Sequence, residues 1–383
     1  MRIGSKKIKA VVSDFDGTIV KGLAQRPSEA FFEMLDELQR QGVFFVAASG
    51  RQYPNLRALF NRLGREIAYI CENGCLVMYK GEVLYKAAIE EDIAEPLIRE
   101  LLTIPDAGLL VAGQECGYIL PDDPEHADFL ERQMGNVIRK VSDFSQVKEP
   151  KLKISIHFPK GIPADVERRL HEKYDDCLQL ADAGNQWLDF NPKGSGKGPA
   201  LRVLAEKLGI RLSETIAFGD SENDISMLQE AGLSFAMDTA REQVKRAARY
   251  VCEDVAEVLR YAMDQDVRVE QMVRQLGQSA GRSPQETDEL WQALDGEEDI
   301  LEEFLYYVQH GTFQGKLCIG EYSAVDILIW QMDHFRAHMD RTSGANRYQP
   351  DHLLFDTLMT LVRMKQNPQP YIEKLRSETG TDL

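Results

Sequence analysis

The fold is decided by the stretch AVVSDFDGTIV at residues 10–20. Its β-branched, apolar start predicts a buried parallel strand, which opens into a loop carrying two carboxylates one residue apart. Open α/β sheets place their chemistry at this end of a strand. Gly17 lets the chain leave extended geometry at once, so Asp14 and Asp16 can serve one site. Because two acids held together repel unless a cation lies between them, the stretch predicts a cation-assisted site rather than a surface turn.

Strands and helices alternate on both sides of this stretch. Buried strands are predicted at residues 43–48 and 67–71, and helices at 28–41 and 54–63. The strand ends carry Ser49-Gly50-Arg51 and Glu72-Asn73-Gly74. This order predicts an α/β fold with a Rossmann-like, doubly wound parallel sheet.

The pattern changes from about residue 77, where a hairpin signature and mixed helices and strands follow. Residues 187–190 are expected to return the chain to the first sheet, and a further strand at 214–218 ends in Gly219-Asp220-Ser221-Glu222-Asn223-Asp224. We therefore expect a core domain formed by residues 1–80 and 187–265, an inserted α+β cap domain at 81–186, and an all-helical domain at 266–383.

Composition narrows the function classes. The chain has 383 residues, a net charge of −17 and 28% charged residues. Without a basic cluster, nucleic acid and anionic membranes are not expected partners. Six scattered cysteines without a Cys-x-x-Cys pair suit a reducing compartment. With no predicted signal peptide and no membrane-spanning run, the expected location is the cytoplasm.

Four strand or loop ends offer the side chains that phosphoryl transfer needs, namely Asp14 with Asp16, Ser49, Lys197, and Asp220 with Asn223 and Asp224. A carboxylate can attack phosphorus and form an aspartyl-phosphate. The attack brings two anions together, so a hard cation on oxygen ligands must screen them, and Mg²⁺ is the expected cofactor. Asp14, Asp220 and a backbone carbonyl beside Asp14 can hold this ion, with Asp224 near or behind its waters.

Three other side chains complete the hypothesis. Lys197 supplies a compact positive charge for the phosphate and the nucleophile. Ser49 and backbone N–H groups can hydrogen-bond the oxygens of the transferring group. Asp16 is placed to protonate the leaving alkoxide and then to activate water against the acyl-phosphate.

The motifs resemble those of the haloacid dehalogenase-like (HAD) phosphatases, specifically the Cof-type branch, in which a large type IIB (C2) cap follows the second motif. The matching segments are residues 14–18, 49–51, 197–198 and 219–224, with 72–74 and 235–240 as secondary signatures. The resemblance covers residues from about 7 to 265 and does not extend to the C-terminal helices.

The resemblance implies a role for each motif residue. Asp14 would be the nucleophile, Asp16 the general acid and base, and Ser49 and Lys197 phosphate contacts. Mg²⁺ would be held by Asp14, the main-chain carbonyl of Asp16, Asp220 and Asp224. Further candidates for binding phosphate or substrate are Gly50, Arg51, Asn73 and Asn223.

The expected function is Mg²⁺-dependent hydrolysis of small phosphorylated metabolites, such as sugar phosphates. In the family that the sequence resembles, Asp at the position of Asp16 is typical of phosphatases and phosphomutases, because an oxygen leaving group needs a proton. One alternative is a phosphomutase that shares the first half-reaction. Another is a regulatory or ligand-binding protein whose working part is the helical domain at residues 266–383. That domain could also mediate a homo-oligomer or bind a protein partner.

Several residues carry two interpretations. Arg51 either reaches the substrate or pairs with a neighbouring carboxylate. Asn73 either orients a substrate or adopts the turn that Asn-Gly favours, and the turn is preferred. His334 and His338 have the spacing of a metal pair, but helix packing is preferred. Cap specificity is expected from polar side chains among His126, Asp122, Asp123, Lys153, His157 and Asp182.

Overall fold

The computed structural model describes residues 1–22, 26–60, 67–121, 124–182, 186–339 and 350–379, without the side chains of 182, 334–339 and 379. Its contacts divide the chain into two compact units. One unit is formed by residues 8–258, and the other by residues 1–7 together with 259–383.

The core of the first unit is a sheet with the strand order β16-β15-β14-β3-β4-β5-β6-β7. Its parallel strands are β16 (Tyr250–Cys252), β15 (Leu233–Met237), β14 (Thr215–Gly219), β3 (Ala10–Asp14), β4 (Phe44–Ala48) and β5 (Ala68–Cys71). The predicted doubly wound parallel sheet is confirmed. The hairpin β6 (Leu76–Tyr79) and β7 (Glu82–Lys86) extends it antiparallel, so residues 82–86 lie in the core sheet rather than in the cap.

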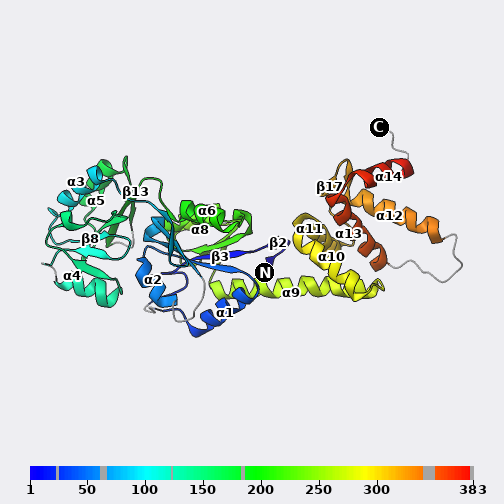
Figure 1. Cartoon of the computed structure of the whole chain (residues 1–383), viewed down its shortest axis with the longest axis horizontal. Helices are drawn as coiled ribbons and strands as arrows, with labels where there is room; N and C mark the ends of the chain where they lie inside the picture. Colours follow the sequence, from blue (N-terminus) through cyan, green and yellow to red (C-terminus); the bar gives the residue numbers. More distant parts are fainter. Residues whose placement is uncertain (23–25, 61–66, 122–123, 183–185, 340–349, 380–383) are drawn as a thin grey trace. The chain divides into compact units, whose positions relative to one another are not determined.

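Helices pack on this sheet through apolar faces (Figure 1). They are α1 (Glu29–Arg40), α2 (Tyr53–Phe60), α6 (Lys197–Leu208), α7 (Ile225–Glu230) and α8 (Glu242–Ala247). In α1 the Ser28 hydroxyl accepts from the Phe31 N–H at the N-terminus, and the buried side chains recur at helical spacing. Residues 61–63 of the helix predicted at 54–63 lie outside the described residues.

The inserted cap has its own sheet, with the order β10-β9-β8-β11-β13-β12. Its elements are α3 (Glu91–Leu101), β8 (Gly108–Ala112), β9 (Gly117–Ile119), α4 (Pro124–Asp128), β10 (Ile138–Lys140), β11 (Lys153–His157), α5 (Ala164–Tyr174), β12 (Leu178–Asp182) and β13 (Trp187–Pro192). Strand β13 pairs with β11 and β12, so residues 187–192 belong to the cap sheet and do not return the chain to the core as expected.

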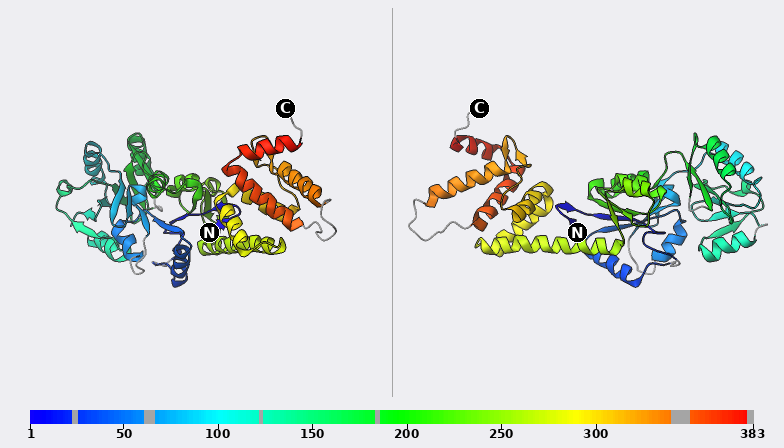
Figure 2. Two further views of the ribbon diagram at one scale, coloured as in Figure 1. Left: turned by 45° about the vertical axis from the view of Figure 1, so that its right-hand side comes forward. Right: turned by 180° about the vertical axis from the view of Figure 1, so that it is seen from behind.

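The second unit is mainly helical (Figure 2). Its helices are α9 (Val255–Ser279, whose first turn lies in the other unit), α10 (Pro284–Gly296), α11 (Glu298–His310), α12 (Ala324–Met339), α13 (Pro350–Gln366) and α14 (Gln369–Thr379). Two hairpins accompany them, β17 (Cys318–Ile319) with β18 (Tyr322–Ser323), and β1 (Arg2–Ile3) with β2 (Lys6–Lys7). The first residues of the chain therefore pack with the C-terminal helices, not with the core as expected.

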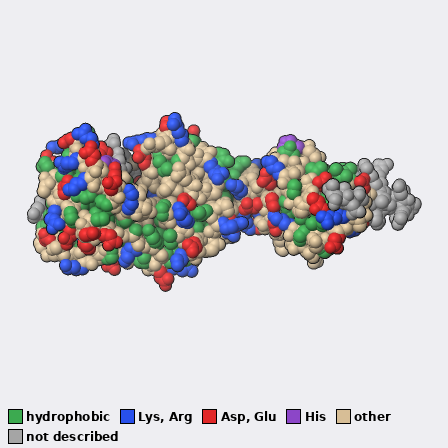
Figure 3. All heavy atoms as spheres, turned by 90° about the horizontal axis from the view of Figure 1, so that it is seen from above, with side chains coloured by type: hydrophobic (Ala, Val, Ile, Leu, Met, Phe, Trp, Pro, Cys, Tyr) green, Lys and Arg blue, Asp and Glu red, His purple; other side chains and the backbone are tan. Residues whose placement is uncertain are grey.

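One face of the molecule shows how its charged side chains are distributed. On the face drawn in Figure 3, acidic and basic side chains are interspersed rather than gathered into one large patch of either sign. No helix within the described ranges combines the length and the apolar character needed to cross a bilayer.

Candidate active site

Asp14, the first residue of the first motif, lies at the end of strand β3. All five residues of this strand are buried. The following loop turns at Gly17, which has φ +88°. A Cβ atom there would overlap the Asp220 carboxylate, and the Thr18 hydroxyl donates to Asp220 Oδ1 at 3.2 Å. Glycine is therefore required where the first motif packs against the fourth.

Lys197 begins α6 and joins two carboxylates. Its side chain is 0% exposed, and Nζ donates to Asp14 Oδ1 and to Asp224 Oδ1, each at 2.6 Å. Burial alone would lower the pKa of Lys197, but the two carboxylates raise it above its ordinary value. Lys197 is therefore charged at neutral pH, as the prediction for this residue requires.

The second oxygen of Asp14 is left without a hydrogen-bond partner among the described residues. Burial raises the pKa of Asp14 well above its ordinary value; the Asp224 and Asp220 carboxylates add to the rise, and Lys197 opposes it. Burial, and then Asp224, also raise the pKa of Asp220. A cation between these carboxylates would offset the repulsion.

The acidic cluster fits a divalent metal. Asp14, Asp220 and Asp224 each bring a carboxylate oxygen within 4.8 Å of the others. Both oxygens of Asp224 are already engaged, Oδ1 by Lys197 and Oδ2 by the backbone N–H groups of Asp220 and Ser221 at 3.0 Å. Asp14 and Asp220 are thus the carboxylates best able to contact a cation, while Asp224 fixes the loop behind them.

Asp16 lies at the mouth of the site. Its side chain is 51% exposed and pairs with Arg51, whose Nε and Nη2 donate to its two oxygens at 2.8 and 2.6 Å. The Ser49 hydroxyl lies 3.4 Å from Asp16 Oδ2. Of the two interpretations of Arg51, the structure shows the pair with a neighbouring carboxylate. The pair is bidentate, the stronger geometry for an arginine and a carboxylate.

Asn73 adopts the turn that was the preferred interpretation. It has φ +56°, the left-handed turn that Asn-Gly favours. Its amide also donates to Asp189 Oδ2 at 2.8 Å and accepts from Asn223 Nδ2 at 3.0 Å. A Cβ atom at Gly50 would lie 2.7 Å from Asn73 Oδ1, so Gly50 makes room for this amide. The Asn73 amide is therefore held by hydrogen bonds on both its nitrogen and its oxygen.

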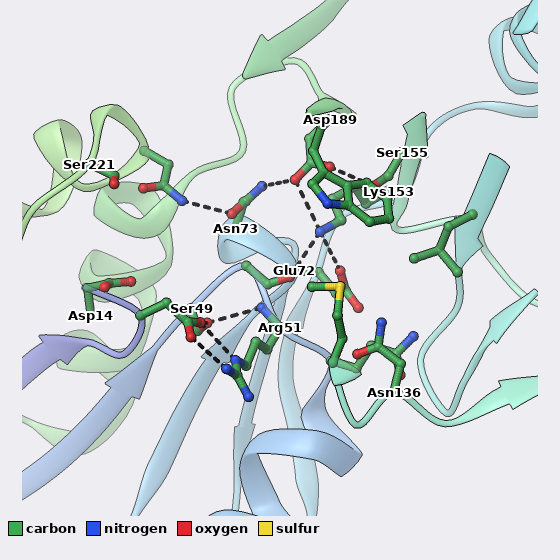
Figure 4. A pocket seen from close by; sticks show the side chains of 17 residues that line it. Asp14, Ser49, Arg51, Glu72, Asn73, Asn136, Lys153, Ser155, Asp189 and Ser221 are labelled. Atoms are coloured by element: carbon green, nitrogen blue, oxygen red, sulfur yellow. Dashed lines mark hydrogen bonds and ion pairs between the residues drawn. The ribbon is translucent and has the colours of Figure 1, made fainter. Parts of the chain in front are cut away.

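These residues line a cavity of about 320 Å³ between the core and the cap. Figure 4 shows Asp14, Ser49 and Arg51 of the core on one side, and Lys153, Ser155 and Asp189 of the cap on the other. The remaining lining residues are Asp16, Gly50, Gln52, Glu72, Asn73, Leu110, Met134, Asn136, Trp187, Ser221 and Asn223. The predicted motif residues are therefore brought together, with Lys197, Asp220 and Asp224 directly behind Asp14.

A buried charge cluster joins the cap to the core and was not predicted as a unit. Lys153 Nζ donates to Gly50 O at 2.9 Å, Glu72 at 3.0 Å and Asp189 at 3.2 Å. Its three N–H bonds are thus used by three acceptors. The signal available in the sequence was the carboxylate of Asp189 between the apolar residues Leu188 and Phe190, since buried carboxylates are rare unless paired.

The other cap candidates are placed differently. His126 and His157 are buried in an aromatic cluster and are not among the described residues that line the cavity. Asp122 and Asp123 lie outside the described residues, as do the side chains of Asp182, His334 and His338. Of the six predicted cap candidates, Lys153 lines the cavity.

The fold and site define a class, a doubly wound α/β protein with an acidic cluster at the carboxyl end of its central strand. The family model described as haloacid dehalogenase-like hydrolase matches residues 11–259. The 5-amino-6-(5-phospho-D-ribitylamino)uracil phosphatase YbjI of Escherichia coli (strain K12) is 30% identical over 243 residues, which is 63% of this chain and 90% of that protein. A phosphoglycolate phosphatase of Metallosphaera sedula is 26% identical over 63% of this chain and 90% of its own.

Solved structures of haloacid dehalogenase-like hydrolases are similar to this chain as well. A haloacid dehalogenase-like hydrolase from Bacteroides thetaiotaomicron has a TM-score of 0.60 and 27% identity, covering 67% of this chain and 99% of its own. The chain belongs to the haloacid dehalogenase-like hydrolases and is a phosphatase of the Cof-type branch. The match to the family ends at residue 259, so it does not include α10 to α14.

Proposed function

We propose that the protein is a Mg²⁺-dependent phosphatase of small phosphorylated metabolites that works through an aspartyl-phosphate on Asp14. One observation carries the proposal. Lys197 holds one oxygen of the buried Asp14 carboxylate, while the other oxygen has no partner among the described residues. That arrangement leaves one oxygen of a fixed carboxylate available for attack on phosphorus.

The first half-reaction forms the acyl-phosphate. Asp14 Oδ2 attacks phosphorus, the ester P–O bond breaks, and protonated Asp16 gives its proton to the leaving alkoxide. The phosphate of the substrate competes with Asp16 for Arg51, because Arg51 and Asp16 both line the cavity. Transfer of Arg51 to the phosphate would release Asp16 to reach the leaving group.

The second half-reaction hydrolyses the acyl-phosphate and regenerates the free enzyme. Asp16 takes a proton from water, the water oxygen attacks phosphorus, and the bond to Asp14 breaks to release inorganic phosphate. Ser49 and Lys197 stabilise charge on the phosphoryl oxygens in both steps. Bound Mg²⁺, held by Asp14, the Asp16 carbonyl and Asp220 with Asp224 behind, would neutralise charge as the two anions meet.

The cavity and the relatives narrow the substrate panel. About 320 Å³ suits a metabolite of modest size. The panel should contain sugar phosphates and 5-amino-6-(5-phospho-D-ribitylamino)uracil, after which the E. coli relative is named. All six cysteines are free in the structure, which supports a cytosolic setting.

The test is phosphate release from this panel with Mg²⁺, with and without a chelator. We expect Asp14→Asn to lower kcat by about 10³-fold or more, because an amide does not attack phosphorus. Asp165→Asn is a matched control, since Asp165 is exposed on α5 of the cap. Borohydride reduction of the working enzyme should convert Asp14, and no other Asp, to homoserine.

Two results would contradict the proposal. One is turnover by Asp14→Asn at the wild-type rate, and the other is phosphate release that a chelator leaves unchanged. An isomerised phosphate ester in place of free phosphate would identify the mutase alternative.

A further inference from the structure

The cap forms one wall of the cavity, and the side chains on this wall change from charged to polar to aromatic along its strands. Side chains two residues apart on a strand share a face, so Lys153, Ser155 and His157 of β11 point the same way. Across the sheet, Ser155 pairs with Leu110 and Asp189, and His157 pairs with Gly108 and Trp187. Leu110, Ser155, Trp187 and Asp189 all line the cavity, so this is the face turned toward the core.

The row nearest the core is closed to substrate. The three N–H groups of Lys153 donate to Gly50, Glu72 and Asp189. In the next row the Ser155 hydroxyl donates to Asp189 Oδ1 at 2.6 Å, and Ser155 Oγ and Asp189 Oδ1 keep lone pairs that can accept from substrate hydroxyl groups. A leaving group that extends from the phosphate therefore meets polar groups before it meets the row of His157 and Trp187, about 13 Å along β11 from Lys153.

That last row is an aromatic stack. The rings of His157 and Trp187 are 4.4 Å apart with an angle of 22° between their planes, and Phe129 stacks on His157 at 4.8 Å and 3°. His126 adds a further ring 5.4 Å from His157. Of the described members of this cluster, Trp187 lines the cavity, and it is half-buried. Packing on several rings fixes the indole in place before any ligand arrives.

We infer that Trp187 is the specificity-determining residue of the cap and that it stacks on a planar ring in the leaving group. The substrate class is a phosphate monoester with a hydroxylated linker and a planar, conjugated ring at the far end. The linker meets Ser155 and Asp189, and the ring extends the stack of Trp187 and His157. This inference rests on the proposed phosphatase function.

The test uses two esters with the same phosphorylated sugar, uridine 5′-monophosphate with a planar ring and ribose 5-phosphate without one. Base–aromatic stacking predicts that wild-type kcat/KM is about 5- to 100-fold higher for the ester that carries the ring. Trp187→Leu keeps an apolar side chain but no ring, and should bring this ratio close to one. Trp187→Phe should retain most of the preference.

The outcomes separate the two proposals. A ratio that stays the same in Trp187→Leu, or equal wild-type values for the two esters, would overturn the role of Trp187 while phosphatase activity stands. If Trp187→Leu does not fold, the wild-type ratio and its value in Trp187→Phe decide the matter. No Mg²⁺-dependent phosphate release from these esters or from p-nitrophenyl phosphate would overturn the proposed function, and this inference with it.

Discussion

At the scale of single residues, Lys197 has opposite effects on its two carboxylates. On Asp224 it completes a set of donors that leaves both oxygens engaged. On Asp14 it engages one oxygen and leaves the other open. The same ammonium thus makes one acid a fixed support and the other a reactive group, and removing it would leave two buried carboxylates without their cation.

Asp16→Asn tests the division of labour between the two motif-one acids. We expect kcat for an alkyl phosphate to fall by about 10²- to 10⁴-fold, because an amide cannot protonate the alkoxide or activate water. With p-nitrophenyl phosphate the leaving group needs no proton, so a burst of one p-nitrophenolate per enzyme should precede the slow phase. Stopped-flow absorbance measures the burst, and Asp165→Asn is again the control.

A wild-type steady-state rate in Asp16→Asn would contradict this prediction. A missing burst together with a slow steady state would instead place Asp16 in formation of the acyl-phosphate even when the leaving group is good.

The core half of the site could be predicted from the sequence, because its residues lie at the ends of strands and the strand pattern therefore determines where they lie. Asp14, Ser49 and Asp220 follow or end buried strands whose parallel pairing brings those ends to one edge. The cap half could not be predicted in this way. Lys153 and Asp189 meet only because β11 and β13 pair in a particular register, and nothing local to either strand specifies its partner.

At the scale of elements, the central strands β3 and β14 are joined at their start by Glu214. Its carboxylate accepts from the Arg211 side chain and backbone and pairs with Lys9, the residue before β3. Burial alone would raise the pKa of Glu214, but the hydrogen bonds from Arg211 and Lys9 lower it to about 2.

Glu214→Gln should therefore destabilise the protein in a pH-dependent way. A carboxyl group whose folded-state pKa is depressed contributes stability above its unfolded pKa of 4.5 and loses it as the pH falls toward about 2. We expect a loss of about 1–2 kcal/mol at pH 7, since both partners are partly exposed. Urea unfolding from pH 7 down to pH 3 measures it. A difference from wild type that does not shrink on acidification would contradict the assignment.

Two elements show what the sequence patterns did not predict, namely the extent of a helix and the sheet that a strand joins. The domain boundary was expected between residues 265 and 266, yet α9 runs across it, because residues 264–266 include no glycine or proline. Residues 187–192 form the predicted kind of element, a strand, but in the other sheet. Alternation identifies a strand and does not identify its neighbour.

At the scale of the whole molecule, the buried Arg2 side chain connects the first residues of the chain to the C-terminal helices by ion pairs. Its side chain is 0% exposed and pairs with Asp266 at 3.2 Å, and it also binds Asp295. Its Nη1 donates to Ser5 O at 2.8 Å, and its guanidinium lies 5.7 Å from the centre of the Trp291 ring. A fully buried guanidinium of this kind is costly to leave with fewer partners, or to delete.

Arg2→Ala should weaken the helical unit selectively. We expect its free energy of unfolding to fall by about 2–4 kcal/mol, because Asp266 and Asp295 each lose one of two cationic partners and a fully buried side chain is removed. Phosphate release by the unit of residues 8–258 should persist. Limited proteolysis, followed by mass spectrometry, locates the first cuts. Arg268→Ala on the exposed side of α9 is the control, with an expected change within about 0.5 kcal/mol. Equal proteolytic sensitivity of both variants would contradict the prediction.

The membership of residues 1–7 in the helical unit has a topological consequence. The chain leaves that unit after residue 7 and re-enters it at residue 259, so the catalytic unit is, in the order of the gene, an insertion within the helical one. Two covalent tethers rather than one connect them. A fragment that spans 259–383 lacks a strand pair and the Arg2 guanidinium. Separating the two units as independently folded polypeptides would therefore require two cuts and a ligation, not a truncation.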